Sequence, residues 1–290
     1  MSANTVQSKR HRSKTIVVTA ILIMALAYTM LPLYYLVIAA TKNERDLATT
    51  FGLWLADDFS LWENVSGIFT YDGGIFLRWL TNTLWYSATS AVIATMLAAM
   101  AGYALAKFAF SGREAVFRII LGSVMIPQTA LVIPLFLLMA KVGMINTPWA
   151  VIVPSMVFPL GVYLMRIYAD EGIPNELIEA ARIDGASELR IFFTVGCRLM
   201  APGLVTVLLL SFVSSWNNYF LPLVVLNTPD SQTLTVGLTN WFAIAAGGQS
   251  SESLFTMIIA GALISLLPII AAFLLLQRYW QSGITAGSGK

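Results

Sequence analysis

Charged residues are scarce in this sequence. Asp, Glu, Lys and Arg together make up 11% of the 290 residues, while 58% are hydrophobic. An ordinary soluble domain carries roughly 25% charged residues, so the composition argues against a water-soluble fold. Six stretches contain no Asp, Glu, Lys or Arg at all: Thr15–Thr41, Trp79–Ala106, Ile119–Ala140, Val142–Met165, Leu199–Pro229 and Ser253–Gln277.

Reactive side chains are almost as rare. Cys197 is the single cysteine, so no internal disulfide can form, and we expect it to be a small buried apolar residue. His11 is the single histidine and precedes the first charge-free stretch. No nucleophile with a base is visible inside the stretches, so the sequence predicts no catalytic residue. It also predicts no metal site, and the net charge of +2 gives no case for nucleic acid.

The charge-free stretches are long enough for helices that cross a bilayer, which takes about 20 residues. A membrane barrel would instead show alternating polarity over about 10 residues. The first stretch exceeds the apolar region of a secretory signal, about 7 to 15 residues, and is interpreted as a spanning helix. The sequence therefore predicts an all-α membrane protein with six transmembrane helices.

The cations give the orientation. Thirteen of the seventeen Lys and Arg residues fall on the side that holds both termini, which places that side in the cytoplasm. The predicted organisation has a cytoplasmic N-terminal segment, a six-helix domain with a long cytoplasmic connection, and a cytoplasmic tail. These parts are residues 1–14, 15–277 with the connection at 166–198, and 278–290.

The long cytoplasmic connection contains residues that typically begin and end helices. Pro174 suits the first position of a helix, and Gly185 suits the left-handed residue that ends one. In the helix of about ten residues between them, Leu177, Ile178 and Ala181 share one face. Glu176, Ala180 and Ile183 lie on the other side, with Glu179 beside them. One face can thus contact the membrane domain. Ser187 can cap a second short helix through Leu189, Ile191, Phe192 and Val195.

The same connection resembles a known motif. Glu179-Ala180-Ala181 followed by Gly185 is similar to the EAA loop of permease subunits of ABC importers. Other stretches narrow the resemblance to the carbohydrate-uptake branch, in the type represented by the second permease of the maltose transporter, and extend it over nearly the whole chain. These stretches are Leu31-Pro32, Thr41-Lys42, Ala104–Phe108, Phe110–Arg113, Ser215–Leu223 and Gly283–Lys290.

The resemblance implies the type I ABC importer permease fold, with a cytoplasmic coupling helix that docks in a cleft of an ATPase. It implies a charged contact for Glu179, close packing for Ala180 and Ala181, and the turn for Gly185, with Asp184 in the same coupling set. One departure is present. The family's loop closes with a branched residue and Leu-Pro, whereas here Val195, Cys197 and Arg198 stand there and the proline comes only at Pro202. The end of the second short helix is therefore left open.

The energy source is expected to lie outside the chain. Proton-driven carriers usually hold an ionisable residue inside a span, and none of the six stretches contains one. Sodium bound by carbonyl groups stays open. The C-terminal Gly283–Lys290 lacks the spacing and the Ser or Thr of a phosphate-binding loop. The expectation is that this chain binds no cofactor, and the resemblance implies that ATP and Mg are bound by the partner ATPase.

The fifth stretch offers residues suited to a sugar, whose hydroxyl groups and apolar ring faces call for amides and aromatic rings. Trp216, Asn217, Asn218 and Tyr219 supply both within one predicted helical turn. The alternative is that these groups form hydrogen bonds between helices. The resemblance implies that a partner permease makes most of the sugar contacts, which weakens the first reading.

The resemblance also implies the partners and the place of the chain. They are a second permease as a hetero-dimer, two ATPase subunits and an extracytoplasmic sugar-binding protein, in a bacterial cytoplasmic (inner) membrane. The implied cargo is a sugar, a di- or oligosaccharide. Alternatives are the same machine for glycerol phosphate or a polyol, a self-sufficient secondary carrier, or a membrane sensor. The outward loop Asn240–Ser251 is implied to enter the cleft of the binding protein, and the tail Gly283–Lys290 to reach toward the ATPase.

Overall fold

The computed structural model describes residues 3–248 and 254–287, with side chains for 15–248, 254–277 and Tyr279. All regular structure in these residues is helical. They form two compact units: the chain up to Thr70 with Trp241–Ile264, and Tyr71–Asn240 with the chain from Ser265. Two segments implied to contact partners lie partly outside the described residues, at 249–251 in the outward loop and 288–290 in the tail.

The first unit is built on α1, Ala3–Ala40. It also holds α2 (Glu44–Thr49), α3 (Leu61–Thr70), the end of α14 (Leu234–Ala246) and the start of α15 (Leu254–Gly287). Asn43 caps α2, because its side chain accepts the N–H of Asp46 at 2.8 Å. The amide of Asn64 in α3 donates to the carbonyls of Ala40 and Lys42, both at 2.9 Å, and so fixes α3 to the end of α1.

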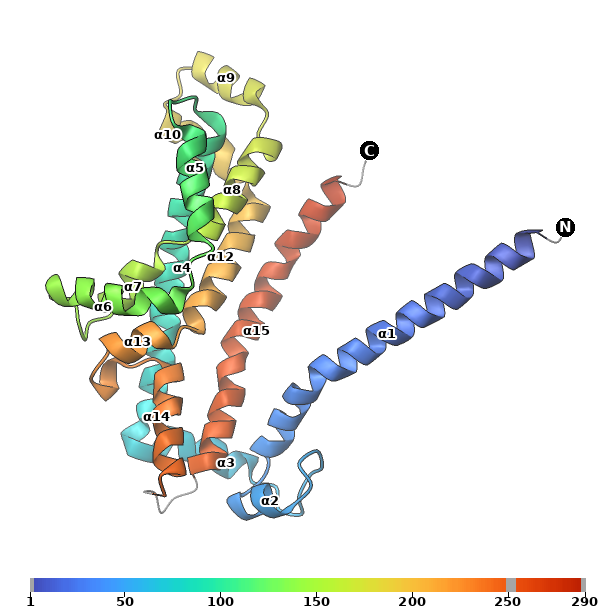
Figure 1. The fold of residues 1–290 in the computed structure, drawn as a ribbon, viewed down its shortest axis with the longest axis vertical. Helices are drawn as coiled ribbons and strands as arrows, with labels where there is room; N and C mark the ends of the chain where they lie inside the picture. Colours follow the sequence, from blue (N-terminus) through green and yellow to red (C-terminus); the bar gives the residue numbers. More distant parts are fainter. Residues whose placement is uncertain (1–2, 249–253, 288–290) are drawn as a thin grey trace. The chain divides into compact units, whose positions relative to one another are not determined.

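The second unit holds the remaining helices. In chain order they are η1 (Tyr71–Gly74), α4 (Ile75–Lys107), α5 (Arg113–Ser123), η2 (Gln128–Leu131), α6 (Val132–Lys141), α7 (Trp149–Ser155), α8 (Pro159–Gly172), α9 (Asn175–Ile183), α10 (Glu188–Ile191), the π-helical η3 (Phe192–Gly196), α11 (Cys197–Leu199), α12 (Ala201–Trp216), α13 (Phe220–Val225) and η4 (Pro229–Ser231). Figure 1 shows α4, α8 and α12 alongside one another, with α9 and α10 at one end of this bundle.

The apolar helices match the six-span prediction when each bent pair counts as one span. Among the described residues, four helical stretches are long and apolar enough to cross a membrane: Thr15–Ala40, Leu61–Lys107, Trp149–Gly172 and Leu254–Gln277. The third predicted span is not one straight helix, because α5 and the η2–α6 segment meet at 96°. Pro127, which lacks an N–H group, lies at this break. The helices before and after Leu199 form the other pair, bent by 83°.

Small residues allow α4, α8 and α12 to approach closely. A Cβ atom added at Gly102 of α4 would lie 2.6 Å from the backbone nitrogen of Arg166 in α8. One added at Gly203 of α12 would lie 2.6 Å from the ring of Tyr168, and one at Gly161 would lie 2.9 Å from Val207. In lipid, where helices gain little from burying apolar surface, close van der Waals contact of this kind drives association.

Polar groups on α4 fix the chain after α13 at the opposite end of the bundle. The indole N–H of Trp79 donates to the carbonyl of Pro229 at 2.8 Å, and the hydroxyl of Tyr86 donates to that of Ser231 at 3.0 Å. The amide of Asn82 donates to the carbonyl of Asp230 at 2.8 Å. Three residues on α4 thus hold η4 in place.

A pair of alanine substitutions tests the packing of the bundle. We expect Gly102→Ala to lower the free energy of unfolding by roughly 1 to 3 kcal/mol, since the added methyl group meets backbone atoms that cannot move aside. The control is Gly122→Ala in α5, where no atom lies within 4 Å of the added Cβ. That change should leave stability unchanged or raise it slightly, because alanine favours the helix. Thermal unfolding of both variants in detergent decides; equal midpoints would contradict the packing argument.

Candidate coupling site

The connection between α8 and α12 contains a short, well-terminated helix. α9 begins at Asn175 and ends at Ile183, with Pro174 as the cap before it and Gly185 at a φ of +79° after it. The N–H of Ala186 donates to the carbonyl of Ala181, and that of Gly185 to Arg182, both at 3.0 Å. This pair of bonds is a Schellman motif, which requires a left-handed residue and therefore favours glycine. The helix was predicted, though it begins one residue after Pro174.

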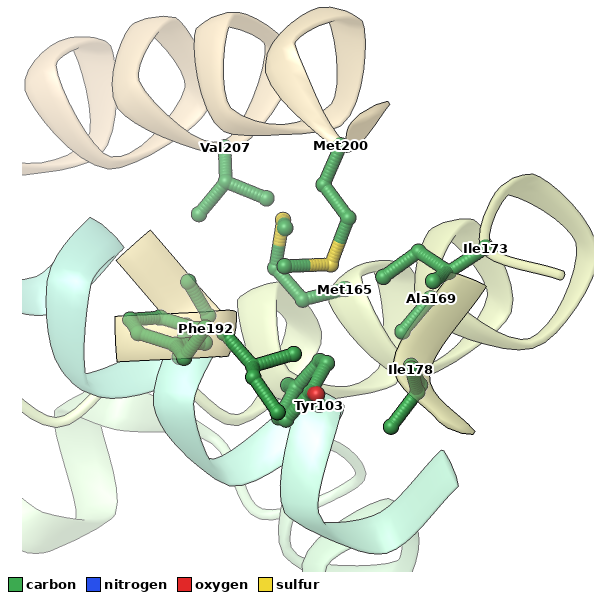
Figure 2. Close-up of a cluster of buried hydrophobic side chains, with 11 residues drawn as sticks. Tyr103, Met165, Ala169, Ile173, Ile178, Phe192, Met200 and Val207 are labelled. Carbon is green, nitrogen blue, oxygen red and sulfur yellow. The ribbon is translucent and has the colours of Figure 1, made fainter. Parts of the chain in front are cut away.

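Buried side chains hold α9 on the membrane bundle. Ile178 lies in a cluster that includes Tyr103 of α4, Met165 and Ile173 around α8, and Met200 before α12. Figure 2 shows Ile178 next to Ala169 in this cluster. Ala181 contacts the same cluster. The prediction of an inward face is therefore correct for Ile178 and Ala181 and wrong for Leu177, which is exposed. Leu177 precedes Ile178 by 100° around the helix and falls beyond the narrow arc that the bundle covers.

Lys107 ties the start of α9 to the end of α4. Its ammonium group donates to the carbonyl of Ile173 at 2.7 Å and to the side-chain oxygen of Asn175 at 3.1 Å. A lysine at the last turn of a helix also complements the negative end of the helix dipole. The sequence reasoning missed this contact, although Lys107 lies in the Ala104–Phe108 stretch that carried the family resemblance.

A second ionic contact braces the end of α9. The guanidinium group of Arg182 binds the carboxylate of Glu188 in α10 through two bonds, Nε to Oε1 at 2.6 Å and Nη2 to Oε2 at 3.2 Å. This bond raises the pKa of Arg182 above its ordinary value. Ser187 caps α10 as predicted, because its hydroxyl accepts the N–H of Arg190. The turn between α9 and α10 is thus held by the Arg182–Glu188 ion pair and by the Ser187 cap.

The second short helix ends differently from the family pattern, and the structure answers the question left open by the sequence. After α10 the chain continues through the π-helical η3 and the short α11, which ends at Leu199. Pro202 then occupies the first turn of α12, where its missing N–H group costs nothing. Cys197 is half-buried and contacts the cluster around Ile178, consistent with its predicted structural role.

The face of α9 that points away from the bundle carries the predicted coupling residues. Glu179, Ala180, Asp184 and Gly185 are all exposed. Between them Ile183 is 86% exposed, the largest such value among the described large hydrophobic residues. An exposed isoleucine flanked by carboxylates is a surface suited to a partner with an apolar cleft and basic groups at its rim.

A third contact, also missed from the sequence, joins α5 to α8 below this loop. Arg166 binds the carboxylate of Glu114 through two bonds, of 2.5 and 3.3 Å. Its guanidinium carbon lies 3.9 Å from the centroid of the Phe117 ring, and Phe117 stacks on Tyr163. A cation over an aromatic face that also binds a carboxylate is a stable arrangement. The third span is thereby linked to the helix that leads into α9.

The proposed sugar-contacting residues do not share one helical turn. α12 ends at Trp216, and Asn217, Asn218 and Tyr219 form a break before α13. Trp216 is buried against Phe212. The amide of Asn217 donates to the carbonyl of Val213 and closes the end of α12, while the carbonyl of Asn218 accepts from Thr235. The prediction of a continuous helix here is wrong. Pro222 has no N–H group to donate to the carbonyl of Asn218, which accepts from the hydroxyl of Thr235 instead.

No group of three or more possible metal ligands occurs among the described residues of the chain.

Comparisons with known proteins agree with this geometry. A family model described as a binding-protein-dependent transport system inner membrane component matches residues 91–284. The chain is 37% identical over 260 residues to an arabinooligosaccharide transport permease of Halalkalibacterium halodurans, covering 89% of this chain and 90% of that protein. It is 31% identical over 291 residues to a melibiose, raffinose and stachyose import permease of Bacillus subtilis, covering 98% and 99%.

Among solved structures, a bacterial ABC transporter involved in the import of the acidic polysaccharide alginate has a chain that matches with a TM-score of 0.78. The identity is 25%, and the match covers 93% of this chain and 97% of that one. The family model spans well over half of the sequence, and the helical architecture agrees with it. This chain therefore belongs to the inner-membrane components of binding-protein-dependent ABC transport systems, as a multi-pass, non-catalytic permease subunit.

Proposed function

We propose that this subunit forms half of the transmembrane pathway for a di- or oligosaccharide, and that α9 transmits the motion of a cytoplasmic ATPase to the spans. The observation that carries the proposal is a short rigid helix with a bare outer face, fixed to the ends of α4, α8 and α12 by its inner one. The sugar is inferred from the names of the relatives, which act on arabinooligosaccharides and on melibiose, raffinose and stachyose.

The outer face of α9 meets the mechanical requirements of docking. Ile183 and Leu177 offer apolar surface that water would otherwise cover, and burying it in a cleft is favourable by about 25 cal/mol per Å². Glu179 and Asp184 flank this surface and can bind basic groups of the partner. Ala180 keeps the helix thin enough for close approach. We assign the coupling contact to Glu179, Ala180, Ala181, Asp184 and Gly185, with Ala181 seating the helix from its inner side.

Force applied to α9 has defined routes into the membrane domain. Ile178 packs in the cluster shared by α4, α8 and α12, and the hydrogen bond from Lys107 to the carbonyl of Ile173 connects the start of α9 directly to α4. Arg166 extends the route to α5 through Glu114. Close-packed protein interiors have low compressibility and transmit strain. A displacement of α9 would therefore move the ends of four helices together.

The partners follow from this mechanism. An importer of this kind requires a second permease to complete the pathway, two ATPase subunits and an extracytoplasmic binding protein that delivers the sugar. ATP and Mg belong to the ATPase subunits in this proposal, and this chain contributes no cofactor site.

The break after α12 is our candidate for the lining of the pathway. Non-helical backbone at membrane depth is tolerated where it is buried in protein or lines a water-filled cavity. The break begins after the 16 residues of α12, about 24 Å along the helix axis from its start. Asn218 and Tyr219 are half-buried there and can offer an amide and a ring face to a sugar. Trp216 and Asn217 support the break from the end of α12.

Two substitutions test the coupling role of α9. Glu179→Ala removes the proposed charged contact, and Gly185→Val forces a branched side chain into a left-handed conformation that costs roughly 1 to 2 kcal/mol. We expect each to reduce sugar uptake by the complex in proteoliposomes at least tenfold, while ATP hydrolysis no longer responds to the loaded binding protein. Glu171→Ala, which removes an exposed carboxylate outside α9, is the control and should transport normally. Normal uptake by both α9 variants would overturn the assignment.

A graded pair of substitutions tests the pathway. Tyr219→Ala removes an aromatic face, whose contacts contribute roughly 0.5 to 1.5 kcal/mol. We expect it to raise the binding-protein concentration for half-maximal sugar-stimulated ATPase activity, or to lower maximal uptake, by up to about tenfold. Tyr219→Phe keeps the ring and should differ little from the unchanged protein. Equal ATPase stimulation and equal uptake in the alanine and phenylalanine variants would contradict a sugar contact for the ring of Tyr219.

The sugar itself is best identified on the purified complex. Arabinooligosaccharides, raffinose and maltodextrins, each presented with the binding protein, should differ in how strongly they stimulate ATP hydrolysis. The expected outcome is stimulation by at least one oligosaccharide and none by glycerol phosphate or a polyol; the reverse pattern would contradict the proposed cargo.

A further inference from the structure

Asn146 joins two connections at the end of the bundle opposite α9. It lies between α6 and α7, and its side chain reaches the chain between α13 and η4. The Oδ1 atom of Asn146 accepts the backbone N–H of Asn227 at 2.9 Å and that of Thr228 at 3.1 Å. The same atom accepts the hydroxyl of Thr228 at 3.1 Å and that of Ser231 at 2.9 Å. One side chain thus binds residues that follow it by 81 to 85 positions.

Four donors around a single oxygen exceed the two lone pairs of a carboxamide. The hydroxyl groups of Thr228 and Ser231 can also bond to each other, at 2.9 Å, whereas the two backbone N–H groups can only donate. These N–H groups identify the atom as the oxygen of the amide, and together the donors surround it with positive potential. The site therefore also suits an aspartate carboxylate, because hydrogen bonds to a charged acceptor are the stronger ones.

The backbone of Asn146 is also fitted to this position. Its φ of +60° is left-handed, a conformation that glycine, asparagine and aspartate adopt more readily than other residues. Its N–H donates to the carbonyl of Val225, the last residue of α13, at 2.7 Å. Asn146 therefore binds the end of α13 with its backbone and the residues that follow α13 with its side chain.

The elements that meet at Asn146 form a group that we call the distal cap: α6, α7, α13 and η4. Figure 1 shows α6, α7 and α13 beside one another, away from α9 and α10. Met139 of α6, Val151 of α7 and Val225 of α13 share a buried cluster. Tyr86 of α4 belongs to the same cluster, and its hydroxyl donates to the carbonyl of Ser231 in η4 at 3.0 Å. The distal cap is thus packed on itself and bound to α4.

A break separates each helix of the distal cap from the rest of its span. α5 and the η2–α6 segment meet at 96°, residues 156–158 interrupt the helix between α7 and α8, and residues 217–219 separate α12 from α13. At these breaks the regular helical hydrogen bonds do not join the cap to the helices that lead to α9. α4 instead runs as one helix from Ile75 to Lys107 and contacts both ends of the bundle. Motion can therefore reach the cap through α4.

We propose that Asn146 is a positioning residue of the transporter, whose Oδ1 atom makes the distal cap move as one body with α4. This inference rests on the proposed coupling role of α9, because α9 is the point where motion enters α4. Trp79, Asn82 and Tyr86 of α4 hold η4, and Asn146 joins η4 to the connection between α6 and α7. Without the oxygen, α4 would move η4 while α6 and α7 follow incompletely. ATP would then be hydrolysed without a matching passage of sugar.

Two substitutions separate the oxygen from the turn. Asn146→Gly removes the oxygen and keeps the left-handed conformation, while Asn146→Asp keeps both. The complete importer is assayed in proteoliposomes with whichever of arabinooligosaccharides, raffinose and maltodextrins stimulates ATP hydrolysis most. We expect Asn146→Gly to lower the sugar imported per ATP at least about fivefold, the lower end of typical coupling between sites. Stimulated hydrolysis itself should stay close to that of the unchanged protein, since α9 and α4 are intact. Asn146→Asp should import normally.

A distance measurement on the same complex follows the cap itself. In an importer otherwise free of cysteine, with Cys197→Ser in this chain, spin labels are placed at Leu137→Cys in α6 and Leu223→Cys in α13. With Asn146 present, the distance between the labels should be the same before and after nucleotide is trapped with vanadate. In Asn146→Gly the distance should change on trapping. A residue that only stabilises the fold would lower the thermal midpoint without making this distance depend on nucleotide.

Three results would overturn the proposal. The first is equal import per ATP in Asn146→Gly and the unchanged protein, and the second is failure of Asn146→Asp to restore import. The third is an equal fall of import and hydrolysis in the glycine variant, because Asn146 would then act on the ATPase response. Glu179→Ala, measured in parallel, tests α9 separately. Normal transport by Glu179→Ala beside deficient Asn146→Gly would count against α9 and in favour of Asn146.

Discussion

The contact of α4 with α8 and α12 is the constraint on which the coupling site depends. Gly102 of α4 meets the backbone of α8 at Arg166, and Gly203 of α12 meets the ring of Tyr168 in α8. At neither position does a side chain larger than a hydrogen atom fit without displacement of a neighbour. This contact brings the end of α4 and the end of α8 to the same level. Lys107 can then reach the carbonyl of Ile173, and Ile178 can enter the cluster between the helices. If the helices were farther apart, α9 would lose the packing of Ile178 and the hydrogen bond from Lys107 that hold it on the bundle.

The stiffness of α9 comes from its ends rather than from its length. A helix of nine residues is too short to be stable alone in water. Here its first turn is bound by Lys107, its last turn is closed by the bonds around Gly185, and Arg182 joins it to α10. The outer face can therefore expose Ile183 without loss of the helix. Transmission of a displacement by α9 requires both fixed ends and an exposed outer face, because a flexible loop with the same residues would change shape instead of moving the spans.

Charge-free stretches and helix-capping residues made much of the fold predictable from the sequence. The charge-free stretches indicated the spans, and Pro174, Gly185 and Ser187 indicated α9 and α10, because caps act through neighbouring backbone groups. The contacts of Lys107, Arg166 and Arg182 could not be predicted in this way. Lys107 and Arg166 bind residues that only helix packing brings near, at separations of up to 68 positions, and Arg182 reaches Glu188 only through the shape of the turn between α9 and α10. Leu177 and Ile178 show the same limit, since the period places both on one side but only the bundle decides which is covered.

Two of the predicted spans are interrupted. The third span bends at Pro127. In the fifth, α12 ends at Trp216, and the carbonyl of Asn218 in the break that follows accepts from Thr235. Backbone groups released at such breaks need partners, because lipid offers none. After α13, side chains of α4 bind the carbonyls of Pro229, Asp230 and Ser231. The helix that carries Lys107 at one end therefore also holds the connection after the broken fifth span at the other. A displacement of α9 that moves α4 would move this connection with it, so one rigid helix can join the coupling loop to the far end of the bundle.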